Sequence, residues 1–311
     1  MTDSSLALGV DGGATKTLGL LAEMEGKIIA RVQTGGSNAN VIGIDAAAGE
    51  LTNLILRCCE EARRPLRNLR SVVLGLAGSG SVAERESLSG AIRDRLSQGG
   101  GPGAALIIET DARVALEGAF DGGPGVVVIA GTGSVVIGKS AAGKLLRTGG
   151  WGRILEDEGS GYHIGLLALK AIAAEFDGFD RSGSLSGILA DRFGWTSREE
   201  VITSVYREKF DLAALAPLVL EAAERDPVAK GILHTSANLL AARVDGTIRQ
   251  LDLSDGTGIV MTGRLIDHDT LYARMLAGCI RKLCPGALFR SPMHPPAEGA
   301  LRMALIRLKK G

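Results

Sequence analysis

Residues 6–22 read LALGVDGGATKTLGLLA, which is an apolar run, a glycine-rich turn and a second apolar run. This pattern predicts a strand, a turn at 11–17 and a returning strand. Residues 125–138 read GVVVIAGTGSVVIG and repeat the arrangement, with the turn at 131–134. The recurrence predicts two sheets, each with a glycine-rich turn between paired strands.

Apolar patterns elsewhere predict strands and helices that alternate along the chain. Further strands are expected at 27–32, 71–78, 105–109 and 257–262. Helices are expected at 45–63, 82–96, 112–120, 161–175, 185–193, 212–224, 228–249 and 298–310. Strands separated by helices indicate an α/β fold whose mostly parallel strands are covered on both faces. The stretch GGGPG at 99–103 is expected to be a loop.

Length and charge exclude several classes of protein. A chain of 311 residues is long enough for about two domains. Lys plus Arg and Asp plus Glu are each 35, so the net charge of zero disfavours a general nucleic-acid binder. No apolar run approaches the ~18 residues that span a bilayer, and no basic region precedes the first apolar run. We therefore expect a cytoplasmic protein with neither a membrane nor a nucleic-acid partner.

Glycine-rich turns after buried strands favour phosphate binding, because glycine lets backbone N–H groups approach anionic oxygens closely. Neither the P-loop pattern nor a strand followed by G-x-G-x-x-G and a helix is present. In a clamp of the strand, turn and strand type, the carboxylate of Asp11 would hold Mg²⁺ through water. A D-G-G turn alone is also typical of an ordinary hairpin, and its recurrence favours the phosphate interpretation.

Five motifs carry a resemblance to a known family. They are GVDGGATKT at 9–17, TDA at 110–112, IAGTGS at 129–134, GGWGRILEDEGSGYHIG at 149–165 and MTGRLI at 261–266. In order and spacing they resemble the BadF/BadG/BcrA/BcrD-type ATPases, a family that includes N-acetylglucosamine kinase and related amino-sugar kinases. The family belongs to the actin, sugar kinase and Hsp70 superfamily, and the resemblance covers nearly the whole chain.

The resemblance implies a two-lobed, actin-like (ribonuclease H-like) α/β fold with duplicated mixed sheets, flanking helices and a cleft between the lobes. Residues 1–113 plus 295–311 would form an N-terminal lobe with the first phosphate loop and the sugar side. Residues 114–294 would form a C-terminal lobe with the second phosphate loop and the adenosine site.

The resemblance also implies roles for single residues. ATP would be bound by Gly12, Gly13, Ala14, Thr15, Lys16, Gly131, Thr132, Gly133, Ser134, Gly263 and Arg264. Asp111 would be the catalytic base, since phosphoryl transfer needs a carboxylate to orient the attacking hydroxyl. Alternatively, Asp111 is a helix N-cap and Lys16 a solvated surface charge.

The sugar would be bound by Asn38, the backbone around Gly150 and Trp151, and the carboxylate of Asp157. Alternatively, Asn38 is a turn residue and Trp151 a core aromatic. Four residues depart from the family pattern. Arg264 replaces a glycine, and Arg153, Glu156 and His163 stand where Pro, Gly and Trp are more common. For that reason the sequence does not identify the particular sugar.

The resemblance therefore implies a homodimeric, Mg²⁺- and ATP-dependent kinase of N-acetylglucosamine, glucosamine or a related amino sugar. One alternative is an activator ATPase of a 2-hydroxyacyl-CoA dehydratase or benzoyl-CoA reductase system. That role needs a cysteine pair near the lobe junction, whereas Cys58 and Cys59 fall on a predicted helix. Another alternative is a kinase of a different small molecule. A sugar-sensing repressor is disfavoured, since only ten residues precede Asp11.

Overall fold

The computed structural model describes residues 5–98, 104–179, 184–253 and 255–310. The expected loop at 99–103 lies outside these residues. The chain divides into two compact units, Met1–Pro124 with Ser291–Gly311, and Gly125–Arg290. The division at 124/125 differs from the expected 113/114, which falls inside helix α4 (Asp111–Ala119). Because α4 packs on helix α11 (Pro296–Leu308), the whole of α4 belongs to the first unit.

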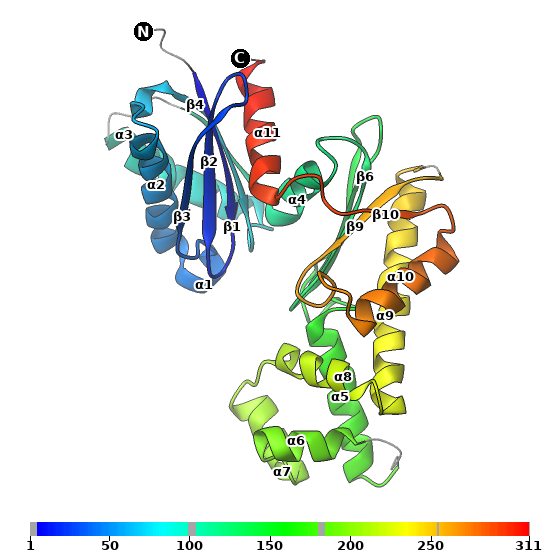
Figure 1. Ribbon diagram of the computed structural model, residues 1–311. Coiled ribbons are helices and arrows are strands. Elements are labelled where there is room, and N and C mark those ends of the chain that lie inside the picture. Colours follow the sequence, from blue (N-terminus) through cyan, green and yellow to red (C-terminus); the bar gives the residue numbers. More distant parts are fainter. Residues whose placement is uncertain (1–4, 99–103, 180–183, 254, 311) are drawn as a thin grey trace. The chain divides into compact units, whose positions relative to one another are not determined.

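The first unit contains a five-stranded mixed sheet with the order β3-β2-β1-β4-β5 (Figure 1). Its strands are β1 (Leu6–Gly12), β2 (Thr17–Glu23), β3 (Ile28–Thr34), β4 (Leu69–Leu76) and β5 (Ala105–Thr110). The first three strands form an antiparallel meander, while β4 and β5 run parallel to β1. The predicted hairpin and the later parallel strands are thus confirmed.

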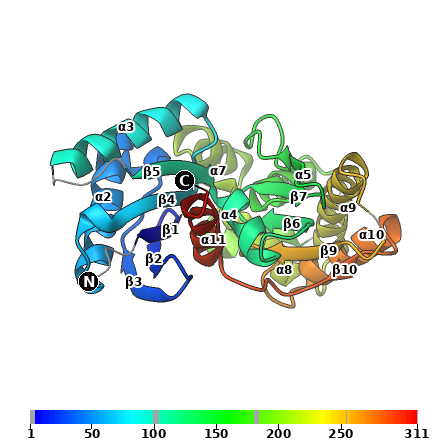
Figure 2. The same ribbon diagram turned by 90° about the horizontal axis from the view of Figure 1, so that it is seen from above.

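Helices cover both faces of this sheet (Figures 1 and 2). On one face lie α2 (Ile44–Glu61), which follows the short α1 (Ala39–Ile42), and α3 (Val82–Gln98). On the other face lie α4 and α11. The apolar stripe Leu51, Leu54, Ile55 and Cys58 of α2 is fully buried against the sheet, as its spacing predicts.

The second unit repeats the plan with a five-stranded sheet in the order β10-β9-β6-β7-β8. Its strands are β6 (Gly125–Ala130), β7 (Ser134–Lys139), β8 (Leu145–Gly149), β9 (Gly258–Thr262) and β10 (Leu288–Phe289). Strands β6 and β7 form the predicted hairpin, and β9 runs parallel to β6. Strands β8 and β10 were not predicted.

Helices dominate the rest of the second unit (Figure 1). They are α5 (Gly161–Phe176), α6 (Leu185–Phe193), α7 (Arg198–Ile202), α8 (Ala216–Ala222), α9 (Pro227–Gln250) and α10 (Leu271–Leu283). Their apolar side chains form one core with β6, β7 and β9. Helix α10 was not predicted. In the described part of the chain, no helix combines the length and apolarity that crossing a membrane requires.

Candidate active site

Asp11 and Asp111 lie at the same edge of the first sheet. Strands β1, β4 and β5 are parallel, so their carboxyl ends meet there, with Asp11 opposite Gly75 and Leu76 opposite Thr110. The two carboxylates repel each other. Burial is the main cause that raises the pKa of Asp11 to about 6, and the charge of Asp111 adds to it, while Lys16 acts in the opposite direction.

The first glycine-rich turn is held in shape by the chain that follows β3. The Gly13 N–H donates to the Lys16 carbonyl at 2.9 Å, and the buried Thr17 hydroxyl donates to the Gly35 carbonyl at 2.7 Å. A Cβ at Gly36 would overlap the carbonyl oxygen of Ala14, so the two segments touch backbone to backbone. The turn therefore presents exposed residues, Lys16 among them, on a fixed backbone.

Asp111 is the first residue of α4, and the residue before it caps the helix. The Arg113 N–H donates to the Thr110 hydroxyl at 3.2 Å. The capping role that was the alternative for Asp111 thus falls to Thr110. The exposed carboxylate of Asp111 accepts from the Ala112 N–H at 2.8 Å, where the positive end of the helix dipole favours an anion.

Asn38 caps α1 and adjoins the loop that follows β4. Its side-chain oxygen accepts from the Asn40 N–H at 2.9 Å, and the Asn40 amide donates to the Gly78 carbonyl at 3.1 Å. A Cβ at Gly78 would lie only 2.5 Å from the side-chain oxygen of Asn38. Asn38 therefore has the structural role that its turn alternative expected, and a sugar-binding role would be additional.

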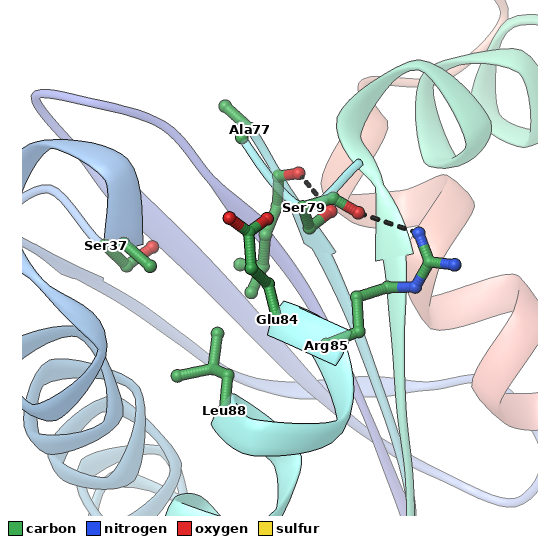
Figure 3. A pocket seen from close by; sticks show the side chains of 9 residues that line it. Ser37, Ala77, Ser79, Glu84, Arg85 and Leu88 are labelled. Carbon is green, nitrogen blue, oxygen red and sulfur yellow. Dashed lines mark hydrogen bonds between the residues drawn. The ribbon is translucent and has the colours of Figure 1, made fainter. Parts of the chain in front are cut away.

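A small pocket with a cavity volume of about 10 Å³, partly open to solvent, lies beside this loop (Figure 3). Its lining residues are Ser37, Ala39, Leu76, Ala77, Gly78, Ser79, Glu84, Arg85 and Leu88. The Ser79 hydroxyl donates to the Leu76 carbonyl at 2.7 Å, and Arg85 donates to the Ser79 carbonyl at 2.7 Å. These bonds fix the wall next to Asn38.

The residues around Asp11 fit a hard divalent cation. The carboxylates of Asp11 and Asp111 are close enough to repel each other, and Lys16 is a positive charge near them. Among the described residues no group of three or more His, Cys, Asp or Glu side chains is placed to hold a metal ion. The carboxylates of Asp11 and Asp111 fit Mg²⁺, which keeps several waters and takes one or two carboxylates plus substrate phosphates.

The second glycine-rich turn, at 131–134, is tied to the start of α5. The carbonyls of Gly131 and Thr132 accept from the N–H groups of Gly161 and Tyr162 at 2.8 and 3.1 Å. Thr132 is exposed, whereas Ser134 is buried and its hydroxyl donates to the Glu158 carbonyl at 2.8 Å. The turn thus has a fixed backbone, and the Ser134 hydroxyl is already engaged within the unit.

Asp157 lies against this second turn. Its carboxylate accepts from the Ser134 N–H at 3.1 Å, and a Cβ at Gly133 would lie 3.1 Å from the same oxygen. The residue is 7% exposed and has a φ of +106°, a backbone angle that residues other than glycine rarely adopt. Burial raises the pKa of Asp157 above its ordinary range, with Glu156 and Glu158 adding to the effect. The predicted sugar ligand is therefore a strained, buried group joined to a predicted phosphate loop.

Gly150 and Trp151 stand in an exposed loop after β8. The Trp151 side chain is 74% exposed, so the core-aromatic alternative is wrong. The Trp151 N–H donates to Glu156 at 3.3 Å, and Arg147 donates to the Gly150 carbonyl at 3.3 Å. The loop thus presents an apolar ring to solvent from a hydrogen-bonded base.

Gly263 follows β9 and lies directly against Ala130, the residue before the second turn. A Cβ at Gly263, where φ is +111°, would overlap the Ala130 carbonyl oxygen. Asp267 holds this corner, because its carboxylate accepts from the Gly263 N–H at 2.7 Å and from the Thr262 hydroxyl at 2.8 Å. Sequence reasoning missed Asp267, whose signal is a carboxylate four residues after the glycine. Arg264 is exposed.

The structure thus collects the predicted site residues in two groups. The first unit holds Asp11, Gly12, Gly13, Ala14, Thr15, Lys16, Asn38 and Asp111. The second unit holds Gly131, Thr132, Gly133, Ser134, Gly150, Trp151, Asp157, Gly263 and Arg264.

The chain is similar to known amino-sugar kinases over nearly its whole length. The N-acetylmuramic acid/N-acetylglucosamine kinase of Clostridium acetobutylicum is 31% identical over 85% of this chain and 86% of its own. The N-acetyl-D-glucosamine kinase of Dictyostelium discoideum is 30% identical over 96% of this chain and 97% of its own. A crystal structure from Chromobacterium violaceum, provisionally named an N-acetylglucosamine kinase, superposes with a TM-score of 0.72 at 25% identity. It covers 97% of this chain and 99% of its own.

The two sheets and their flanking helices are therefore those of the actin-like sugar-kinase fold that the motifs implied. A sequence model of the BadF/BadG/BcrA/BcrD ATPase family matches residues 8–304, and this chain belongs to that family.

Proposed function

We propose that this protein is an ATP-dependent kinase that transfers the γ-phosphoryl group to a hydroxyl of N-acetylglucosamine, glucosamine or a related amino sugar. The family is one of ATPases, and two relatives of at least 30% identity carry names of amino-sugar kinases. The observation that carries the proposal is the exposed carboxylate of Asp111, at the sheet edge that also bears Asp11 and the first glycine-rich turn.

Asp111 would orient the attacking sugar hydroxyl and accept its proton as the new bond to phosphorus forms. One oxygen of the Asp111 carboxylate already accepts the Ala112 N–H at 2.8 Å, and this bond restricts the side chain before the substrate binds. Since little covalent chemistry falls to the protein in phosphoryl transfer, this positioning is most of what a base contributes.

The glycine-rich turns would bind the phosphates. In the first unit the backbone of Gly12, Gly13 and Ala14 and the exposed Lys16 supply donors and positive charge. In the second unit the turn at 131–134 supplies backbone donors, and the corner at Gly263 would accept the adenosine.

Asp11 would hold Mg²⁺ through water, with Asp111 adding negative charge nearby. The ion would neutralise charge on the β- and γ-phosphate oxygens when it is bound.

The sugar would be bound by Asn38, Trp151, the Gly150 backbone and Asp157. Asp157 already accepts the Ser134 N–H through one oxygen, which leaves its second oxygen to accept a sugar hydroxyl. The exposed Trp151 ring offers an apolar face for the ring carbons of a sugar. A homodimer is a further expectation from the resemblance, and a cytoplasmic location is an expectation from the apolar patterning of the sequence.

The test is ADP release from Mg-ATP with N-acetylglucosamine, glucosamine, N-acetylmannosamine, N-acetylmuramic acid and glucose, each against Asp111→Asn. Release that depends on one amino sugar and disappears in Asp111→Asn supports the proposal and names the substrate. ATP hydrolysis that no sugar stimulates contradicts it.

A further inference from the structure

Helix α9 lies along the segment 148–163, which contains the proposed sugar residues Gly150, Trp151 and Asp157. Ser236, Leu240, Arg243 and Thr247 of α9 are spaced by four, three and four residues, a spacing that places their side chains on one face of the helix. All four contact the segment.

The two ends of this face hold the two ends of the segment by hydrogen bonds. The hydroxyls of Thr247 and Thr148 are 2.7 Å apart. At the other end, the Ser236 hydroxyl lies 3.1 Å from Nδ1 of His163. The Gly159 N–H donates to the same nitrogen at 3.4 Å, which identifies Nδ1 as the acceptor of the ring. Burial lowers the pKa of His163 and so favours this neutral form.

The middle of the face fixes the backbone next to Asp157. A Cβ at Gly159 would lie 2.6 Å from the Cβ of Leu240, so the segment touches the helix without an intervening side chain. The fully buried Tyr272 of α10 donates its hydroxyl to the Gly159 carbonyl at 2.7 Å.

Arg243 pairs with the acidic residues on both sides of Asp157. Its guanidinium lies 2.8 Å from Glu156 and also bonds the carboxylate of Glu158. The side chains of Arg243 and Glu156 are only 22% and 8% exposed. Removing one partner of a pair this buried leaves an uncompensated charge, so the segment would have to move to regain solvent.

We propose that Arg243 is the positioning residue of Asp157. By holding Glu156 and Glu158 on α9, it keeps the strained backbone between them in place and the Asp157 carboxylate against the Ser134 N–H. The inference rests on the proposed function insofar as Asp157 binds the sugar. Arg243 itself does not contact sugar or nucleotide in this proposal, because it acts through the segment 148–163.

The test compares Arg243→Met with Arg243→Lys and Glu156→Gln. The last two variants keep part of the pairing, and they provide the measurement if Arg243→Met does not fold. Arg249→Met is the matched control, because Arg249 is on the same helix, pairs with Asp245 and is 73% exposed. Steady-state KM values for sugar and ATP are measured in each variant. Trypsin cleavage after the exposed Arg153 reports the order of the segment without any ligand.

Arg243→Met is expected to raise the sugar KM about tenfold and the ATP KM less than about threefold, with partial recovery in Arg243→Lys. In an Asp157→Asn background the same change should add less than about twofold, because both changes act on one group. Cleavage after Arg153 should be faster in Arg243→Met and unchanged in Arg249→Met.

Unchanged cleavage in Arg243→Met, or full additivity with Asp157→Asn, would overturn the positioning role. Failure of the proposed function looks different. The unmodified enzyme would then release no ADP on addition of any sugar, and the cleavage result would still decide on Arg243.

Discussion

The Asp157 carboxylate accepts a hydrogen bond from the Ser134 N–H at 3.1 Å, which joins a proposed sugar ligand to a proposed phosphate loop. The two residues are 23 positions apart and come from different motifs. The hydrogen bond therefore links the two motifs directly. In the proposed kinase, loss of this bond should weaken the binding of the sugar more than the binding of ATP.

Asp11→Asn should raise the Mg²⁺ concentration needed for half-maximal ADP release by about 10- to 100-fold, the range seen when a partner of a bound metal is removed. The melting temperature should stay the same or rise, because the repulsion between Asp11 and Asp111 disappears. A magnesium titration and a thermal melt measure the two effects. Asp45→Asn, at an exposed carboxylate paired with Arg95, is the control. An unchanged Mg²⁺ requirement in Asp11→Asn would contradict the metal assignment.

Gly263→Ala should lower the free energy of unfolding by ~3 kcal/mol, since it adds a strained φ and a collision with the Ala130 carbonyl oxygen. Gly256→Ala is the matched control, because Gly256 has a φ of +88° but open space around a Cβ, and it should cost only ~1 kcal/mol. Urea unfolding measures both. An equal loss of unfolding free energy in the two variants would mean that the contact with Ala130 does not destabilise Gly263→Ala.

His163 should make the protein less stable as the pH falls. Burial lowers its pKa in the folded state, so below the ordinary histidine pKa of about 6.5 the unfolded chain takes up a proton that the folded chain does not. Stability from this group is therefore present above that pH and is lost below it. The free energy of unfolding, measured with urea at pH 5.5 and 7.5, should differ less between the two pH values for His163→Gln than for the unmodified protein. His234→Gln, at an exposed histidine of α9, should leave the difference unchanged.

The hairpins and their turns could be predicted because the signal is local. The alternation of apolar residues and the glycines of 6–22 and 125–138 define strand and turn without any distant contact, and β1, β2, β6 and β7 are where that pattern put them. Strand β8 and helix α10 were missed. Strand β8 is largely exposed and contains Arg147, so it lacks the apolar run of a buried strand. Helix α10 does have an amphipathic pattern, because Tyr272, Leu276 and Ile280 are buried at a spacing of four residues, so the sequence was sufficient to predict it.

The candidate site residues were proposed motif by motif, but the contacts around them could not be predicted from the sequence. The T-D-A motif singled out Asp111, whereas only the structure shows that Thr110 takes the cap. Arg243 is 85 residues from Glu158, and nothing in the sequence pairs them. Glu156 and His163, which depart from the family pattern, each contact α9, a relation that exists only in the folded chain.

The most direct test of the account is the rate of sugar-dependent ADP formation by Asp111→Asn, with the ATP dissociation constant measured by calorimetry in the same preparation. The account predicts a rate lower by about 10²- to 10⁴-fold, since an amide cannot accept the proton of the attacking hydroxyl. ATP binding should change less than about threefold, because Asp111 acts on the acceptor hydroxyl. A rate close to that of the unmodified enzyme would remove Asp111 from the base role and contradict the proposed mechanism.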